Sequence, residues 1–181
     1  MVSATVSKKA DRWFEATDIN GDGQIQRSDL RALGERILTH FGHNVDSAKG
    51  RKLLQAYDRS WEYIASAMDM DRDEAISKEE FRVYMDEKAD RKNADKALRP
   101  VTDAEFAAAD VDDDGYLSRD EYAELLRAFN VKDQDAHVGA EAIDTDRDGR
   151  ISPEEYFRAC RDLFAGGENL GERSGQVFGR L

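Results

Sequence analysis

Residues 110–121 place oxygen-bearing side chains at a spacing that suits a hard divalent cation. The stretch reads D-V-D-D-D-G-Y-L-S-R-D-E. Carboxylates at its first, third, fifth and twelfth positions can turn inward together with the main-chain carbonyl of the seventh residue, and such an oxygen cage binds calcium. Glycine at the sixth position lets the chain turn sharply between the ligands. The expected ligands are Asp110, Asp112, Asp114, the carbonyl of Tyr116, and Glu121.

Three further stretches repeat this design. In chain order, loop I is residues 18–29, loop II is 69–80, loop III is 110–121 and loop IV is 144–155. The other expected ligands are Asp18, Asn20, Asp22, the carbonyl of Gln24 and Asp29 in loop I; Asp69, Asp71, Asp73, the carbonyl of Ala75 and Glu80 in loop II; and Asp144, Asp146, Asp148, the carbonyl of Arg150 and Glu155 in loop IV. Four copies with the same internal offsets indicate a repeat of EF-hand type that binds three to four calcium ions.

Two loops depart from the common pattern. Asp29 ends loop I where the other loops end in glutamate, and its side chain is one methylene shorter. This favours a smaller, six-coordinate cage, so loop I could bind magnesium or bind calcium more weakly. Glu74 replaces glycine at the sixth position of loop II, where a residue with a side chain strains the backbone. Loop II therefore either binds an ion despite this strain or keeps only the fold of a calcium loop.

Helices must hold these loops in place. Apolar residues recur at helical spacing before and after each loop, for example Leu30, Leu33 and Ile37 after loop I. The eighth residue of each loop is aliphatic, and we expect Leu117 of loop III to face Ile151 of loop IV across a short antiparallel pairing. The sequence thus predicts an all-α protein: four EF-hands in two paired lobes, packed into one compact globular body.

Several local signals mark where these helices begin. Ser77, Ser118 and Ser152 each stand three residues before the glutamate that ends a loop, so each can cap the outgoing helix. Pro153 suits a first helical position, where its missing N–H costs nothing. Residues 86–99 are densely charged and lead to Pro100, which suggests a solvated helical tail and a linker between the lobes. Residues 102–105 resemble a capping box that starts a new helix.

The composition excludes some partners and supports others. The formal net charge is -12 and the pI is near 4.7, so nucleic acids and anionic membranes would be repelled. Four bound dications would reduce that charge to -4. No segment reaches the roughly 18 apolar residues of a membrane span, and the N-terminus lacks the apolar core of a signal peptide. Cys160 is the only cysteine and lies on an apolar helical stripe, which predicts a buried thiol in a reducing compartment. We expect a cytoplasmic monomer.

The chain resembles the sarcoplasmic calcium-binding proteins, together with calexcitin and calerythrin. The resemblance covers essentially the whole chain and rests on its length, on the four loops with a widened gap in the first pair, and on the final Q-V-F-G-R-L. It implies two EF-hand lobes packed closely together and a calcium buffer, often with magnesium competition. The predicted division is an N-terminal pair in residues 1–92, a C-terminal pair in 93–165 and a tail in 166–181 packed on the core.

A calcium buffer or store is the leading hypothesis for the function, and it has three alternatives. The first is a calcium sensor with a dedicated but unidentified protein partner; a broad adaptor is disfavoured because only four methionines are present. The second is a luciferin-binding protein or photoprotein, for which the three histidines, His40, His43 and His137, are too scattered. The third is an enzyme, for which the sequence offers no pair of nucleophile and base, phosphate loop or zinc spacing.

Overall fold

The apolar stripes of the sequence become helices that each bury one face. The computed structural model describes residues 11, 13–87 and 91–164. Helical residues 13–17 lead into loop I. The following elements are β1 (Gln24–Ile25), α2 (Arg27–His40), α3 (Ala48–Met68), β2 (Ile76–Ser77), α4 (Lys78–Glu87), α5 (Arg91–Ala109), β3 (Leu117–Ser118), α6 (Arg119–Ala128), α7 (Asp133–Ile143), β4 (Arg150–Ile151) and α8 (Pro153–Phe164). Helices make up most of the described part of the chain, and its strands have only two residues each, which confirms the predicted all-α class.

The loops pair through their short strands. β1 is antiparallel to β2 with Ile25 opposite Ile76, and β3 is antiparallel to β4 with Leu117 opposite Ile151. All four aliphatic side chains are fully buried. The predicted pairing of Leu117 with Ile151 is therefore confirmed, and loops I and II form an equivalent pair.

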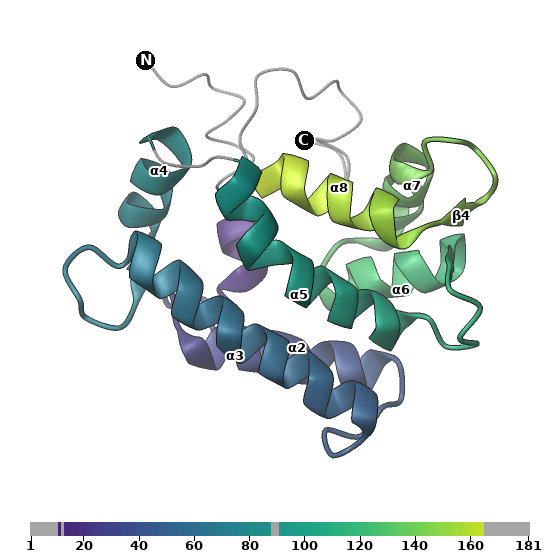
Figure 1. The fold of residues 1–181 in the computed structure, drawn as a ribbon, viewed down its shortest axis with the longest axis horizontal. Helices are drawn as coiled ribbons and strands as arrows, with labels where there is room; N and C mark the ends of the chain where they lie inside the picture. Colours follow the sequence, from purple (N-terminus) through teal and green to yellow (C-terminus); the bar gives the residue numbers. More distant parts are fainter. Residues whose placement is uncertain (1–10, 12, 88–90, 165–181) are drawn as a thin grey trace.

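We call loops I and II with their helices the N-terminal half, and loops III and IV with theirs the C-terminal half. Helix α5 lies between α3 of the N-terminal half and α8 of the C-terminal half (Figure 1). It packs against α3 on one side and against α8 on the other, and α2 contacts α6 directly. Buried side chains from all these helices form a single hydrophobic core. The two pairs of loops are thus joined by one shared interior.

The expected linker before Pro100 and the new helix after it are corrections to the sequence prediction. Helix α5 runs through Pro100 without a break, and Thr102 lies inside it, where its hydroxyl donates to the carbonyls of Leu98 and Arg99. Leu98 and Val101 are buried. We attribute the continuity to this apolar face, whose burial offsets the roughly 3 kcal/mol that proline costs inside a helix.

The predicted helix starts in the loops are confirmed. The hydroxyls of Ser77, Ser118 and Ser152 each accept a hydrogen bond from the N–H three residues later, at 3.2–3.3 Å. Pro153 is the first residue of α8. The outgoing helices therefore begin at fixed points relative to the last ligand of each loop.

Two further sequence predictions are not tested by the described helices. The predicted division between residues 92 and 93 falls in the first turn of α5 and stays a prediction. The predicted packing of the tail, residues 166–181, lies outside the described residues. Among the described helices, none is both long and apolar enough to cross a membrane.

Candidate metal centres

One recurring hydrogen bond holds the backbone of every loop. The N–H of the sixth residue donates to Oδ2 of the first aspartate in all four loops. The pairs are Gly23 to Asp18 at 2.9 Å, and Glu74 to Asp69, Gly115 to Asp110 and Gly149 to Asp144, each at 3.1 Å. The fourth and sixth residues of each loop have a positive φ, at Gly21, Arg72, Asp113 and Arg147 and at Gly23, Glu74, Gly115 and Gly149. The four loops therefore share one backbone conformation.

Loop II adopts this conformation although glycine is absent. Glu74 has a φ of 66°, in the left-handed region that side chains disfavour by roughly 1 kcal/mol or more. Its N–H nevertheless makes the same bond to Asp69 as the glycine N–H makes in the other loops. The substitution thus strains loop II without changing its shape.

The fifth and seventh residues of each loop are also linked in one way. The N–H of the seventh residue donates to Oδ1 of the fifth. The pairs are Gln24 to Asp22 and Ala75 to Asp73 at 2.9 Å, and Tyr116 to Asp114 and Arg150 to Asp148 at 2.8 Å. This fixes the fifth carboxylate relative to the residue whose carbonyl is the next expected ligand.

The twelfth residue closes three loops in one way and loop I in another. In loops II, III and IV the glutamate accepts hydrogen bonds from the N–H groups of the second and ninth residues, at 2.8–2.9 Å. In loop I the shorter Asp29 still reaches the ninth residue, Gln26, at 2.9 Å. Its other oxygen accepts from the third residue, Asn20, at 3.3 Å. The missing methylene therefore changes which part of the loop the last carboxylate reaches.

In each of loops II, III and IV, three of the four expected carboxylates gather closely enough to share an ion. In each of three loops, three carboxylates offer one oxygen each, and these oxygens lie within 4.8 Å of one another: Asp69, Asp71 and Asp73; Asp110, Asp112 and Glu121; Asp144, Asp146 and Glu155. Asp18, Asp22 and Asp29 of loop I form no such group, and the amide of Asn20 at the third position makes this loop less acidic. Glu80, Asp114 and Asp148 also lie outside the three groups.

The first carboxylate of loop IV has an oxygen that a cation would satisfy. Oδ1 of Asp144 is buried and has no hydrogen-bond partner among the described residues. A buried carboxylate oxygen without a hydrogen-bond partner is costly, whereas a bound calcium ion coordinates such oxygens. The donor set of loop IV, an all-oxygen set of carboxylates and a carbonyl, fits calcium.

The surroundings of two ligands act on their protonation in opposite directions. Burial would raise the pKa of Glu155, but hydrogen bonds from Ser152 and Thr145 outweigh it and lower the pKa to about 2. Burial also raises the pKa of Asp110, which the N–H groups of Gly115 and Asp114 oppose. Glu155 is therefore ionised near neutral pH, as a calcium ligand must be.

Known proteins share both the loops and their arrangement. A family described as an EF-hand domain pair matches residues 101–161, and one described as an EF hand matches residues 10–33. A calcium-binding protein of Streptomyces coelicolor has a structure that superposes with a TM-score of 0.82 at 30% identity, over 90% of this chain and 99% of its own. This chain is an EF-hand calcium-binding protein.

Two more relatives place this EF-hand protein in the group suggested by its sequence. Calerythrin of Saccharopolyspora erythraea is 26% identical over 169 residues, which cover 92% of this chain and 96% of calerythrin. A sarcoplasmic calcium-binding protein of amphioxus shares the fold, with a TM-score of 0.76 at 16% identity over the full length of both chains. The protein is therefore a calcium-binding EF-hand protein of the sarcoplasmic calcium-binding protein, calexcitin and calerythrin group.

Contacts between the two halves reach loop III of this EF-hand protein. Nζ of Lys49, in the first turn of α3, lies 2.7 Å from the carbonyl oxygen of Asp110 and 2.7 Å from Oδ1 of Asp113. Nε2 of His43 donates to the carbonyl of Ala108 at 2.9 Å. Sequence reasoning missed these contacts because they join residues more than 60 positions apart. The residues that widen the gap between loops I and II thus bring the N-terminal half against loop III.

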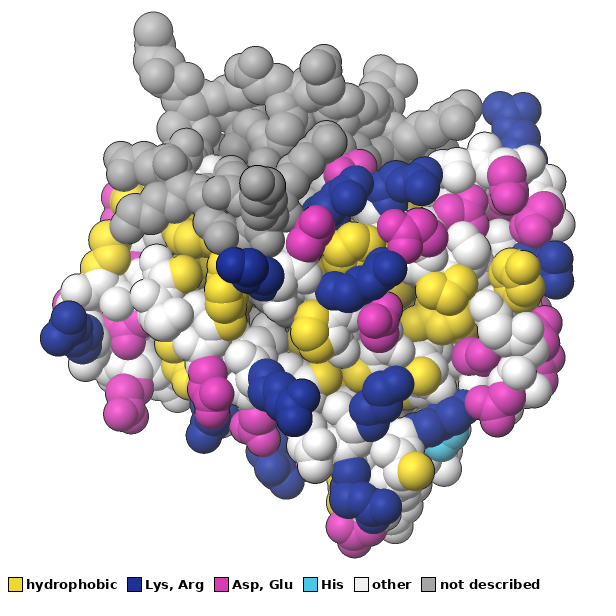
Figure 2. Space-filling view, viewed as in Figure 1, with side chains coloured by type: hydrophobic (Ala, Val, Ile, Leu, Met, Phe, Trp, Pro, Cys, Tyr) yellow, Lys and Arg dark blue, Asp and Glu magenta, His cyan; other side chains and the backbone are white. Residues whose placement is uncertain are grey.

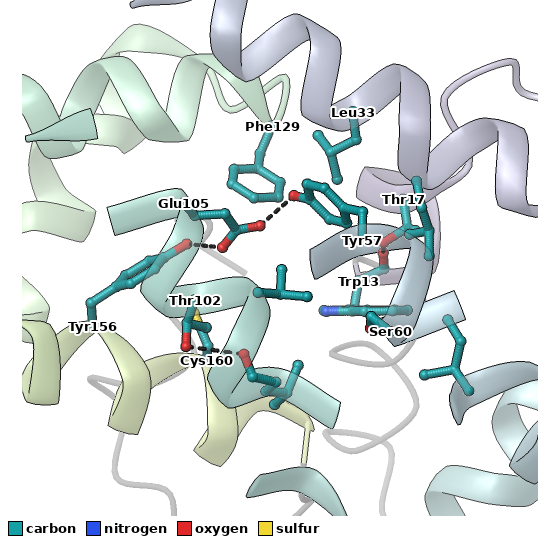
Figure 3. Close-up of a pocket in the computed structure, with 14 residues that line it drawn as sticks. Trp13, Thr17, Leu33, Tyr57, Ser60, Thr102, Glu105, Phe129, Tyr156 and Cys160 are labelled. Atoms are coloured by element: carbon teal, nitrogen blue, oxygen red, sulfur yellow. Dashed lines mark hydrogen bonds between the residues drawn. The ribbon is translucent and has the colours of Figure 1, made fainter. Parts of the chain in front are cut away.

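Sequence reasoning also missed a buried carboxyl between the halves (Figure 3). Glu105 of α5 is almost fully buried and accepts hydrogen bonds from the hydroxyls of Tyr57 on α3 and Tyr156 on α8. Burial raises its pKa to about 7, although both hydroxyls lower it. Its position three or four residues from buried Val101, Thr102 and Ala108 was the available signal, because an acid there continues a buried stripe.

The cavity beside Glu105 is small. It measures about 60 Å³ and is lined mainly by apolar side chains from both halves, including Trp13 and Leu33. Small-molecule sites usually measure roughly 300–1,000 Å³, and no histidine is among the described lining residues. The luciferin-binding alternative therefore gains no support from this cavity. Cys160, predicted to be buried, lines it but is only partly buried, and the apolar surroundings of its thiol raise its pKa.

Proposed function

We propose that loops I to IV each bind one divalent cation through the ligands expected from the sequence. The observation that carries this proposal is the common loop conformation, in which the N–H of the sixth residue holds the first carboxylate in all four copies. In loops II, III and IV this conformation brings three carboxylates close together, at the cost of mutual repulsion. Bound calcium relieves that repulsion, so binding adds to the stability of the folded chain.

For loop I we propose magnesium competition. Asp29 ends this loop and is bonded to Gln26 and Asn20, so its carboxylate is held closer to the middle of the loop than the glutamates of the other loops. A smaller cage with fewer oxygens suits Mg²⁺, which requires six ligands at short distances. Calcium would then occupy loops II, III and IV, with Glu74 lowering the affinity of loop II.

We further propose that the protein is a calcium buffer or store. The helices of both halves contribute to one core, and among the described residues the large hydrophobic side chains that are exposed are only Val45, Met70 and Val111. On the face shown in Figure 2, apolar side chains appear in small groups between acidic and basic ones. A sensor that captures a helix needs a larger continuous apolar surface.

A calcium sensor is the second candidate. It is favoured by the Streptomyces coelicolor relative, whose structure was solved as the basis of calcium-mediated regulation in a prokaryote. The contacts of Lys49 and His43 with the segment that begins loop III offer a route by which calcium at that loop could change the packing of the halves. Such a sensor would have one dedicated protein partner.

Calorimetric titration with calcium, with and without millimolar magnesium, tests the number and preference of the sites. We expect four cation-binding events, one of which loses its calcium heat in magnesium. Two or fewer events would contradict the proposed sites. Binding of a hydrophobic dye separates the two functions, because a large increase on adding calcium would replace the buffer by the sensor.

We also propose that the protein acts as a monomer in the cytoplasm and carries no enzymatic activity. A lone cysteine is compatible with a reducing compartment. The Asp and Glu side chains of the loops are accounted for either as expected cation ligands or as exposed surface residues. Sedimentation at micromolar concentration, with and without calcium, would test the oligomeric state.

A further inference from the structure

Arg119 of loop III reaches across to a ligand of loop IV. It is the tenth residue of loop III and the first residue of α6. Its Nη2 lies 3.2 Å from Oδ2 of Asp144, and its Nη1 lies 3.9 Å from Oε1 of Glu141. The side chain of Asp144 is only 1% exposed. A cation from one loop is therefore paired with the most buried ligand of its partner loop.

The same position in the other pair of loops behaves differently. Arg27, the tenth residue of loop I, pairs with Asp58 and Glu62 of α3, at 3.4 and 3.2 Å. Lys78, the tenth residue of loop II, pairs with Asp11 and Glu15 at 3.4 and 3.5 Å. Each of these acids precedes the partner loop and is not an expected ligand. Of these three basic side chains, only Arg119 touches an expected ligand.

The two oxygens of Asp144 have separate roles. Oδ2 accepts from both Arg119 and the N–H of Gly149, while Oδ1 has no partner among the described residues. Arg119 thus leaves one oxygen for the cation. It also keeps Asp144 paired when no metal is bound, which matters because an unpaired buried charge is strongly unfavourable.

Both effects of Arg119 oppose cation binding. Its pairing stabilises loop IV without metal, and its fixed positive charge repels an incoming cation. A second positively charged side chain, Arg150, belongs to loop IV itself, and its Nη2 lies 3.5 Å from Oδ2 of Asp148. That aspartate is more exposed than Asp144, so solvent screens the pair.

We propose that Arg119 is an affinity-determining residue of loop IV. Its positively charged side chain, which belongs to loop III, lowers the affinity of loop IV for metal ions, most strongly for the most highly charged ions. The proposal rests on the proposed function, because it requires that loop IV binds a cation. It makes loop III part of the electrostatic environment of its partner.

Arg119→Gln tests the proposal, with Arg27→Gln as the matched control. The two arginines occupy the same loop position and are similarly exposed, at 47% and 53%. Glu155→Gln identifies the calcium-binding event of loop IV. We expect Arg119→Gln to raise the calcium affinity of that event by about 3- to 10-fold at low salt, with a smaller gain in 0.5 M KCl. Arg27→Gln and Arg119→Lys should leave it near the original value.

A second ion distinguishes charge from loop shape. Coulomb energy is proportional to the charge of the ion, so Arg119→Gln should increase the affinity for Tb³⁺ more than for Ca²⁺. If loop IV binds calcium but Arg119→Gln leaves its affinity unchanged or lowers it, Arg119 does not act through its charge and the inference is wrong while the proposed function stands. If Glu155→Gln removes no binding event, both are wrong.

Discussion

Oε2 of Glu105 accepts a hydrogen bond of 2.6 Å from the hydroxyl of Tyr156, the residue that follows the last expected ligand of loop IV. Its other oxygen accepts from Tyr57 of the N-terminal half. One carboxyl group between two tyrosines therefore joins α3, α5 and α8. The protonation of this carboxyl therefore bears on how the halves are held together.

Because Glu105 titrates, the free energy of unfolding should fall as pH rises from about 4.5 to 7. Burial raises the pKa of this carboxyl from 4.5 to about 7 in the folded chain, so the folded state binds the proton more tightly than the unfolded state. The protonated carboxyl makes its full contribution to stability below pH 4.5. This contribution, about 3 kcal/mol in all, is lost as pH rises through 7. The nearby Tyr57, Tyr122, Tyr156 and Cys160 have raised pKa values and stay neutral in this range.

Glu105→Gln should remove this part of the pH dependence. Glutamine keeps hydrogen-bonding atoms between the tyrosines but does not titrate. Urea unfolding of both proteins in excess chelator, at pH values from 5 to 8, measures the difference. Equal pH dependence in the two proteins would show that Glu105 is not the group that titrates.

Glu74→Gly should stabilise the metal-free protein by about 0.5–1 kcal/mol. The φ of 66° at this position strains a residue with a side chain, and glycine relieves the strain at some cost in unfolded-state entropy. Glu79→Gly is the matched control, since Glu79 is an exposed residue of helix α4 where glycine should destabilise by about 1 kcal/mol. Denaturant midpoints decide, and a loss of stability in Glu74→Gly would contradict the strain argument.

The sequence predicted the loops well because a chelating loop is local. The spacing of the expected ligands and the serine caps is set within twelve residues, and the pairing of Leu117 with Ile151 follows from one position in each loop. Helix α5 shows the limit of this reasoning. Pro100 is a local signal to stop, but packing against α3 and α8 decides otherwise, and those helices are distant in sequence.

The contacts made by Arg119 and Glu105 were unpredictable for the same reason. In sequence, Arg119 is an unremarkable basic residue near the end of a loop, and Glu105 reads as a capping acid. Their partners lie 25 residues and about 50 residues away, respectively. Only the folded arrangement of loops and helices shows which charge each one meets.

Asp29→Glu should raise the calcium affinity of loop I and reduce its response to magnesium. The added methylene lets the carboxylate reach further toward the second residue of the loop, as it does in loops II to IV. We expect a gain on the order of tenfold, which corresponds to about 1.4 kcal/mol. Calcium titration in millimolar magnesium measures it, and an unchanged magnesium effect would argue against loop I as the magnesium site.

Removal of calcium should lower the melting temperature. At a free calcium concentration of 100 times the Kd, one site adds about 2.7 kcal/mol to the free energy of unfolding. Glu121→Gln and Glu155→Gln should each reduce the difference between melts in calcium and in chelator, because each removes one ligand of a C-terminal loop. Identical melting temperatures with and without calcium in the original protein would mean that binding is not coupled to folding.

The two-residue ladders of β1 with β2 and of β3 with β4 have a consequence for timing. Ile25 and Ile76 are fully buried against each other, as are Leu117 and Ile151, so neither loop of a pair can open far without disturbing the other. The two ions bound by one pair of loops should then be released together. Rapid mixing with a fluorescent chelator would record calcium release in two phases, one for each ladder, where four independent loops would give four.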